Sequence, residues 1–219
     1  MKRFVFDFET MAQDPDAVVL SCALTFFDNE MKTFQEYVDQ TYYWKFDIDH
    51  QIKDYKRSIN QQTLDWWDKQ DQDVKKSQFE PTDLDITLVD FIVKMKQAMN
   101  ENGVNNHSLG YVRGQSFDFP ILSDIVKQVM GEIDSFKINP AFYPIPFWQQ
   151  RDIRSYIAGL LMSPESTKCP VPKGALDGFE YHNPIHDNAR AILMIQYAEA
   201  YADGMEVPEE EDWDENSMK

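Results

Sequence analysis

Residues 4–10, with the sequence FVFDFET, constrain this chain more than any other segment. The segment is typical of a hydrophobic β-strand, and it carries two carboxylates, Asp7 and Glu9, two residues apart. Because side chains alternate between the faces of a strand, both acids project to the same side. Neighbouring acids repel each other and are costly in a half-buried strand unless a positive charge lies between them. A divalent metal ion such as Mg²⁺ or Mn²⁺ would supply that charge, and an edge strand with two solvated acids is the alternative.

Composition predicts a folded domain in a reducing compartment. The 219 residues are 42% hydrophobic and 14% aromatic, which is enough for one well-packed core. Since no apolar run approaches the roughly 20 residues of a membrane span, we expect no membrane association. The N-terminus leads directly into the first strand, which argues against a signal peptide. Cys22 and Cys169 lack metal-ligand spacing, so they favour the cytoplasm over a disulfide scaffold or a zinc site.

The net charge of −17 is unusual for a protein that would bind nucleic acid, because phosphate contacts normally call for a basic surface. Part of this charge is local, since residues 206–219 hold seven acids and one base. Acidic blocks are usually solvated, so we expect a single folded domain over residues 1–205 and a disordered acidic tail over 206–219. A bound metal cluster would lower the effective charge at a site.

The pattern of apolar residues predicts an α/β domain with a central mixed β-sheet flanked by helices. Three strands are expected first, at 3–9, 18–27 and 32–39, as an antiparallel meander with a turn at 28–30. The following elements are expected in order: an irregular loop at 41–57, helices at about 60–70 and at 83–101 with Thr82 as cap, a strand at 109–113, a helix from Pro120 to about 130, a loop at 131–150, a short helix at 152–162, a loop at 163–180 and a last helix from Pro184 to about 202.

Two further acids and two histidines extend the first pair. Asp118 lies where a loop leads into a helix, and Asp187 lies in the first turns of the last helix. Each alone could be a capping or dipole-stabilising acid. Together with Asp7 and Glu9 they could surround two metal ions, which can activate a water and stabilise the leaving oxygen of a phosphodiester. His182 or His186 could then act as the general base, because its pKa lies near neutrality.

The motifs Asp7-x-Glu9, Phe117-Asp118 and His182-x4-Asp187 occur in this order between residues 4 and 187. In these motifs the chain resembles the DEDDh branch of the DnaQ-like 3′–5′ exonucleases. A sister branch has a tyrosine one residue nearer the last aspartate, where this chain has Asn183. The resemblance therefore implies that His182 is the base and that His186 is only its neighbour.

The resemblance implies an RNase H-like fold, dependence on two Mg²⁺ or Mn²⁺ ions and release of 5′-mononucleotides from 3′ ends, preferably of single-stranded DNA. It implies that Asp7, Glu9 and Asp187 hold one ion, that Asp7 and Asp118 hold the second, and that His182 takes the proton of the attacking water. Glu9 and the backbone of Thr10 and Met11 are expected near the terminal 3′-OH. Gln115 departs from the family, which often has an asparagine at this position.

Aromatic and basic residues are candidates for contacts with the substrate. Stacking on an aromatic ring is worth ~1–3 kcal/mol per base. Trp66 and Phe117 are favoured over Trp67 and Phe147, because adjacent tryptophans on a helix cannot both face the core and Phe117 adjoins an acid of the site. Arg113, Arg151 and Arg154 can bind phosphate or pair with the many acids. Asp152 resembles a family position near the site, but an ion pair with an arginine is expected for it.

Two alternatives to a DNA exonuclease are considered. An exoribonuclease of the same fold would share every motif, because the metal site acts on the phosphate and not on the sugar. An acidic protein that mimics DNA would explain the net charge, but it would need no ordered metal site. Nucleic acid is the expected partner, and no partner protein is implied.

Overall fold

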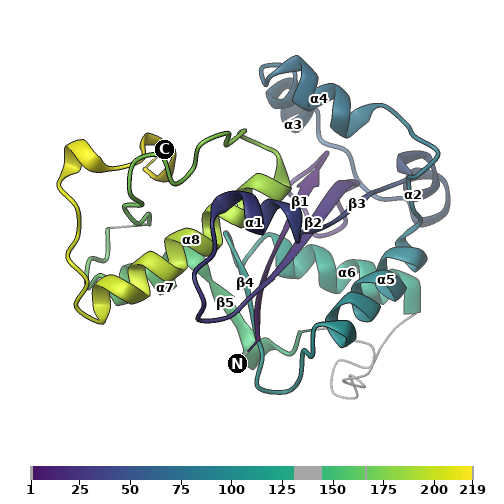
Figure 1. Ribbon diagram of the computed structural model, residues 1–219. Coiled ribbons are helices and arrows are strands. Elements are labelled where there is room, and N and C mark those ends of the chain that lie inside the picture. The colour runs from purple at the N-terminus through teal and green to yellow at the C-terminus, as the bar shows by residue number, and fades with distance from the viewer. Residues whose placement is uncertain (1, 131–144, 166, 219) are drawn as a thin grey trace.

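A five-stranded mixed β-sheet forms the centre of the protein (Figure 1). The computed structural model describes residues 2–130, 145–165 and 167–218. Strand order is β3-β2-β1-β4-β5; β2 runs antiparallel to β1 and β3, whereas β4 is parallel to both β1 and β5. The strands are β1 (Arg3–Thr10), β2 (Val19–Phe27), β3 (Tyr42–Lys45), β4 (Leu109–Val112) and β5 (Gln150–Asp152). The predicted α/β class with a mixed sheet is therefore confirmed.

Helices cover both faces of this sheet (Figure 1). One face packs on α5 and α6, and the other packs on α8, which is flanked by α1 and α7. The helices are α1 (Phe34–Asp39), α2 (Ile48–Tyr55), α3 (Gln61–Trp67), α4 (Gln72–Phe79), α5 (Leu88–Glu101), α6 (Asp118–Met130), α7 (Ile153–Leu160) and α8 (Pro184–Ala202), with short 3₁₀ turns at Phe147–Gln149, Glu210–Asp212 and Glu215–Ser217.

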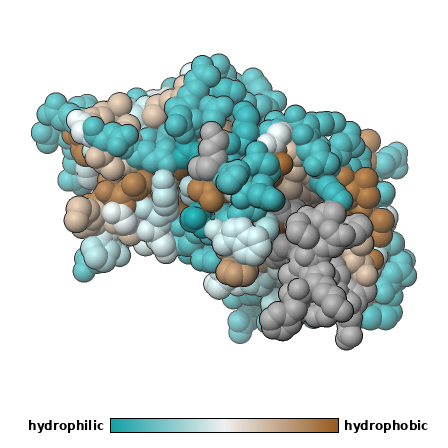
Figure 2. Space-filling model, turned by 90° about the horizontal axis from the view of Figure 1, so that it is seen from below, coloured by the Kyte–Doolittle hydropathy of each residue, from teal (hydrophilic) through white to brown (hydrophobic). Residues whose placement is uncertain are grey.

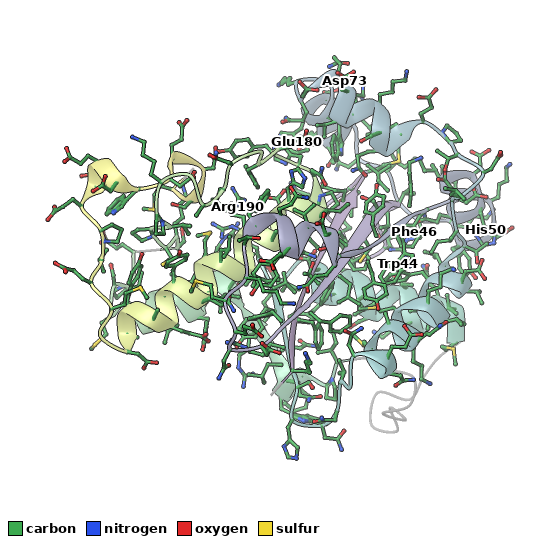
Figure 3. The ribbon with its side chains drawn as sticks, viewed as in Figure 1. Trp44, Phe46, His50, Asp73, Glu180 and Arg190 are labelled. Atoms are coloured by element: carbon green, nitrogen blue, oxygen red, sulfur yellow. The ribbon has the colours of Figure 1, made fainter. Side chains whose placement is uncertain are left out.

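Strand β1 divides its side chains between these two layers. Phe4, Phe6 and Phe8 belong to the core under α5 and α6, while Val5 belongs to the core under α8. Asp7 and Glu9 follow Val5 at intervals of two, so they face α8. The α5 core also receives side chains from the β3 side of the sheet, where Trp44 and Phe46 lie (Figure 3).

The strand expected at 32–39 is wrong. This segment forms helix α1, because Thr33 and Glu36 complete a capping box in which each side chain accepts from the backbone N–H of the other residue. The third strand of the meander is β3, which lies with α2 inside the segment expected to be an irregular loop. Local hydrogen bonding thus outweighs the alternation of apolar residues over these positions.

The helix expected at 83–101 begins five residues later, at Leu88, with Thr87 as its N-cap. Thr82 is instead hydrogen-bonded to Asp85, whose carboxylate pairs with Lys45 of β3. Helix α4 and strand β5 were not expected. The loop expected at 131–150 lies mostly outside the described residues. The helices expected near 60–70, 120–130, 152–162 and 184–202 are confirmed by α3, α6, α7 and α8.

Residues 212–218 pack against the loop that precedes α8, whereas a disordered tail was expected over 206–219. Trp213 forms a β-bridge with Pro172. The buried side chain of Asp214 accepts hydrogen bonds from the backbone N–H groups of Gly174 and Leu176. One acid of the acidic block therefore satisfies two backbone donors, which its average composition could not reveal.

The face shown in Figure 2 is largely hydrophilic, and hydrophobic side chains gather on it only in small groups. None of the helices in the described ranges has both the length and the apolar character needed to span a bilayer. Cys22 and Cys169 are buried and unpaired.

Candidate active site

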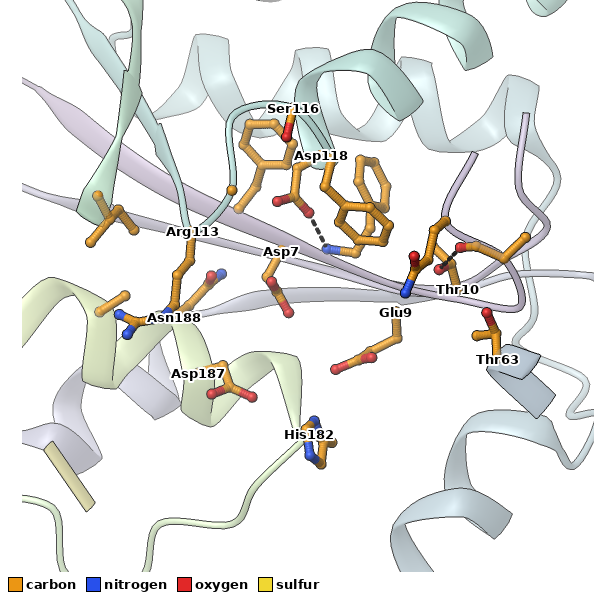
Figure 4. A pocket seen from close by; sticks show the side chains of 18 of the residues that line it. Asp7, Glu9, Thr10, Thr63, Arg113, Ser116, Asp118, His182, Asp187 and Asn188 are labelled. Carbon is orange, nitrogen blue, oxygen red and sulfur yellow. Dashed lines mark hydrogen bonds between the residues drawn. The ribbon is translucent and has the colours of Figure 1, made fainter. Parts of the chain in front are cut away.

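A cleft of about 840 Å³ opens where β1 and β4 end and where α3, α6, α7 and α8 begin or approach (Figure 4). Four loops far apart in the sequence meet here because the sheet places β1 beside both β2 and β4. Almost all the residues expected at the site line this cleft, namely Asp7, Glu9, Thr10, Trp66, Phe117, Asp118, His182 and Asp187.

Three carboxylates converge in the cleft. One oxygen each of Asp7, Glu9 and Asp187 lies within 4.8 Å of the others. Asp7 and Glu9 share a face of β1, and Asp187 reaches them from the first turn of α8, which is capped by Asn183. The pairing of β1 with β2 shifts directly after Glu9, a bulge of the kind that re-aims strand residues beside functional sites.

Asp118, the fourth acid, is the first residue of α6 and is almost fully buried. Its Oδ1 accepts a hydrogen bond from the backbone N–H of Phe8 at 3.0 Å, which ties α6 to β1 (Figure 4). Gly114 has φ 141°, a conformation that favours glycine, and its C=O accepts from the N–H of Phe117. This turn brings the chain from the end of β4 back toward β1 at Asp118.

Burial makes ionisation of these acids costly in the absence of a cation. The pKa values of Asp7 and Glu9 are raised well above their ordinary values, first by desolvation and then by the neighbouring carboxylates. Desolvation raises the pKa of Asp118 to about 7, and it also raises the pKa of Asp187, against the opposing effect of Arg190. A set of converging carboxylate oxygens under such mutual repulsion fits a hard divalent cation such as Mg²⁺ or Mn²⁺.

His182 lines the same cleft from the loop before α8. Its backbone has φ 61°, and its ring meets the edge of Trp66 with centroids 4.7 Å apart. Burial lowers the pKa of His182 below its usual value, partly opposed by Asp187, so the ring is neutral at pH 7. A neutral imidazole beside the carboxylates can accept a proton.

His186, in contrast, is held by contacts within the protein. Its Nδ1 accepts a hydrogen bond from the backbone N–H of Glu180 at 3.0 Å, and its ring packs edge-on against Phe34. It does not line the cleft. Figure 3 shows Glu180 on the loop above α8 and Arg190 on that helix. Of the two histidines, only His182 lines the cleft, and its role as the base stays a prediction.

In the segment after Glu9, several backbone groups already form hydrogen bonds within the protein. The C=O of Thr10 accepts from Trp67 Nε1, and its Oγ1 donates to the C=O of Ala12. Met11 is buried outside the cleft, where its N–H donates to Val18 and its C=O accepts from Asn60. Both backbone groups of Met11 therefore take part in hydrogen bonds within the protein, and the position of Thr10 and Met11 near the terminal 3′-OH stays a prediction.

The two adjacent tryptophans diverge, as the helix geometry predicts. Both border the cleft, but Trp67 is 1% exposed and belongs to the core, whereas Trp66 is 39% exposed. Phe117 also lines the cleft beside Asp118. Phe147 is 77% exposed and lies outside the cleft, on the 3₁₀ turn before β5.

Two residues of α8 that line the cleft are not part of the sequence motifs. Arg190 donates from Nη2 to Asp187 Oδ1 at 2.7 Å, and its guanidinium covers the ring of Phe179. The i,i+3 spacing to Asp187 was the signal for this pair. Asn188 donates to the C=O of Val5 on β1, while its Oδ1 is buried without a hydrogen-bond partner in the described structure.

Within the described ranges Asp152 forms no ion pair with an arginine, so the expected pairing is wrong. It caps α7 by accepting from the N–H and Oγ of Ser155, and it also accepts from the backbone N–H of Gln115. The side chain of Gln115 is exposed and is not among those that line the cleft.

Comparison with known proteins agrees with this geometry. The family model of the 3′–5′ exoribonuclease Rv2179c-like domain matches residues 2–200, so the chain belongs to this family of 3′–5′ exonucleases. The chain is 39% identical to the exodeoxyribonuclease of Enterobacteria phage T4. The match runs over 230 residues and covers 100% of this chain and 98% of that protein. The predicted family and the class of enzyme, a nuclease, are confirmed.

Solved structures share the fold at low sequence identity. The *E. coli* exonuclease I complex with single-stranded DNA has a TM-score of 0.56 at 10% identity and covers 91% of this chain. Exonuclease I from Methylocaldum szegediense has a TM-score of 0.52 at 11% identity and covers 87% of this chain. This chain spans only 40% and 38% of those two chains, respectively. The likeness confirms the predicted exonuclease fold.

Proposed function

We propose that this exonuclease removes 5′-mononucleotides one at a time from the 3′ end of DNA, mainly single-stranded DNA. The observation that carries the proposal is the convergence of Asp7, Glu9 and Asp187 within 4.8 Å in a cleft that His182 also lines. A single narrow cluster with one base beside it is suited to hydrolysis of one phosphodiester bond at a chain end.

The carboxylates would hold two Mg²⁺ or Mn²⁺ ions. Asp7, Glu9 and Asp187 would hold one ion, and Asp7 and Asp118 the other. Two such ions, when bound, acidify the attacking water and neutralise charge on the leaving oxygen. Asp118 is held in place by its hydrogen bond from Phe8, so its free oxygen is directed by the backbone of β1 and not by a mobile side chain.

His182 would take the proton of the attacking water. It is neutral before the reaction, because burial lowers its pKa, and Asp187 stabilises the imidazolium that forms. The edge of Trp66 restricts the ring from one side. Trp66 and Phe117 would stack on the terminal bases, and Thr10 would lie near the terminal sugar.

DNA is favoured over RNA by the relative that matches the whole chain, whose name is exodeoxyribonuclease. The description of the matching family names exoribonuclease, so RNA remains the alternative substrate. An acidic DNA mimic is disfavoured, because a mimic has no need for buried carboxylates that converge on one point. The phage relative and the two free cysteines favour the cytoplasm of an infected cell.

The test compares matched 5′-labelled oligonucleotides of single-stranded DNA, RNA and duplex DNA, with Mg²⁺, with Mn²⁺ and with EDTA. We expect a ladder that shortens from the 3′ end of single-stranded DNA, slower digestion of the other two and no digestion in EDTA. Faster digestion of RNA would reverse the substrate assignment. Undiminished digestion in EDTA would overturn the metal-dependent mechanism.

A further inference from the structure

Two arginines that line the cleft, Arg113 and Arg154, form no ion pair with any carboxylate of the described residues. Arg154 makes no hydrogen bond or ion pair with any described residue, and Arg113 contacts only Met194 Sδ at 3.9 Å and the C=O of Thr167 at 3.4 Å. Acids outnumber bases by 38 to 21 in this chain, and Arg3, Arg57 and Arg190 are all paired with carboxylates. Guanidinium groups left unpaired in such a protein indicate that they serve a ligand.

Burial and neighbouring cations oppose the charge of Arg113 more than the nearby carboxylates of Asp187 and Asp152 support it. Its side chain is half-buried, directly after β4, and Arg154 and Arg190 lie close enough to repel it. Burial and these two cations lower the pKa of Arg113 to about 10, so it is still charged at neutral pH. A phosphate between these groups would relieve both the desolvation and the repulsion, and it matches the planar donor geometry of arginine.

The two ends of the cleft differ in chemistry. Figure 4 shows Arg113 on one side of the carboxylates and Thr63 on the other. The side of Thr63 is lined by neutral groups from α3, including Trp66 and Asn60. A 3′-terminal nucleoside carries no further phosphate, so it suits the neutral end. The retained strand carries a phosphate at every step, so it suits the end with Arg113 and the exposed Arg154.

We propose that Arg113 and Arg154 bind the backbone phosphate one step to the 5′ side of the scissile bond. This subsite rests on the proposed function and sets the direction in which the strand enters the cleft. It holds the part of the strand from which the leaving 3′-oxygen comes. Binding there would help to align the scissile phosphate with the carboxylates, because only one nucleotide separates the two phosphates.

The test removes the charge of one phosphate at a time. The probe is dT10 in which the second linkage from the 3′ end is a methylphosphonate, which is neutral, and the control probe carries it at the fifth linkage. We expect the wild type to release the first nucleotide about 10-fold more slowly from the first probe than from unmodified dT10, the loss typical of a charged hydrogen bond. The control probe should change this rate little.

The variants locate the subsite. Arg113→Gln and Arg154→Gln should digest unmodified dT10 about 10-fold more slowly and should lose most of their sensitivity to the second linkage, because the two changes remove the same contact. Arg151→Gln is the matched control. It lies on neighbouring β5, bonds only to the C=O groups of Trp148 and Gln150 and does not line the cleft, so it should keep the wild-type sensitivity.

The outcomes separate the two proposals. If the wild type is insensitive to the second linkage, or if Arg154→Gln stays as sensitive as the wild type, the subsite is wrong while the nuclease activity stands. Arg154 is exposed, so its variant should fold even where Arg113→Gln does not. If unmodified dT10 releases no mononucleotide at all, the proposed function fails first.

Discussion

The two faces of β1 show how one strand can serve stability on one side and chemistry on the other. Phe4, Phe6 and Phe8 are buried against α5 and α6 and contribute to the core. Asp7 and Glu9 alternate with them and face α8, where desolvation and mutual repulsion raise their pKa values. The same strand thus holds some of the most favourable and some of the least favourable burial in the molecule. Predictions that separate the two faces follow.

Asp7→Asn should give the largest effect, a loss of roughly 10³-fold or more in the rate of mononucleotide release, because it removes a ligand shared by both proposed ions. The fold should persist, since asparagine is isosteric and removes a repelled charge. Digestion of labelled oligonucleotide and circular dichroism check both points. The charge-matched control is Asp14→Asn. Asp14 is an exposed acid in the loop between β1 and β2, so this variant should keep full activity.

Phe6→Ala should destabilise the core on the opposite face of β1. Phe6 is fully buried and packs edge-on against Phe8 and Phe119, so its truncation should lower the free energy of unfolding by ~3–5 kcal/mol. Urea denaturation measures this loss. The same truncation at the exposed Phe147 should change stability by about 0.5 kcal/mol or less. Equal losses at the two positions would contradict the assignment of the core.

His182→Ala should lower the rate by ~10²-fold or more with little loss of stability. His186→Ala should show the converse, because His186 holds the loop through Glu180 and Phe34 and does not line the cleft. Rates at saturating substrate and thermal unfolding temperatures for both variants decide the assignment. A larger rate loss for His186→Ala would mean that the wrong histidine had been chosen.

The free-energy cost of burying the carboxylates should make the free energy of unfolding depend on pH. The pKa of Asp118 is raised to about 7, so between about pH 4 and pH 7 the folded protein binds more protons than the unfolded chain. For this group, the free energy of unfolding of the metal-free protein therefore falls as the pH rises through that window. The loss is complete above pH 7 and absent below pH 4.

Asp118→Asn isolates this contribution, because its Oδ1 can still accept from Phe8. In EDTA the variant should be more stable than the wild type at pH 8, by roughly 1–4 kcal/mol, and the two should converge near pH 4. Urea denaturation at both pH values measures the difference. A gap that does not change with pH would show that the Asp118 side chain is not desolvated as described.

Parts of the fold could be predicted because their signals are local. The strand at residues 3–9 alternates along its length, and the start of α8 has Pro184 after a capping Asn183. The strand expected at 32–39 failed because a capping box overrode alternation. The tail expected at 206–219 failed because Asp214 and Trp213 find partners in a loop some 40 residues earlier.

The sequence by itself determined which side chains can do the chemistry. The spacing of Asp7 and Glu9 places both on one face of a strand, and the four residues between His182 and Asp187 match the family motif that implies His182 as the base. Only the tertiary structure decided what these groups experience. The convergence and the desolvation of the carboxylates depend on distances between segments more than 100 residues apart. Spacing along the chain contains no such distances, because packing sets them.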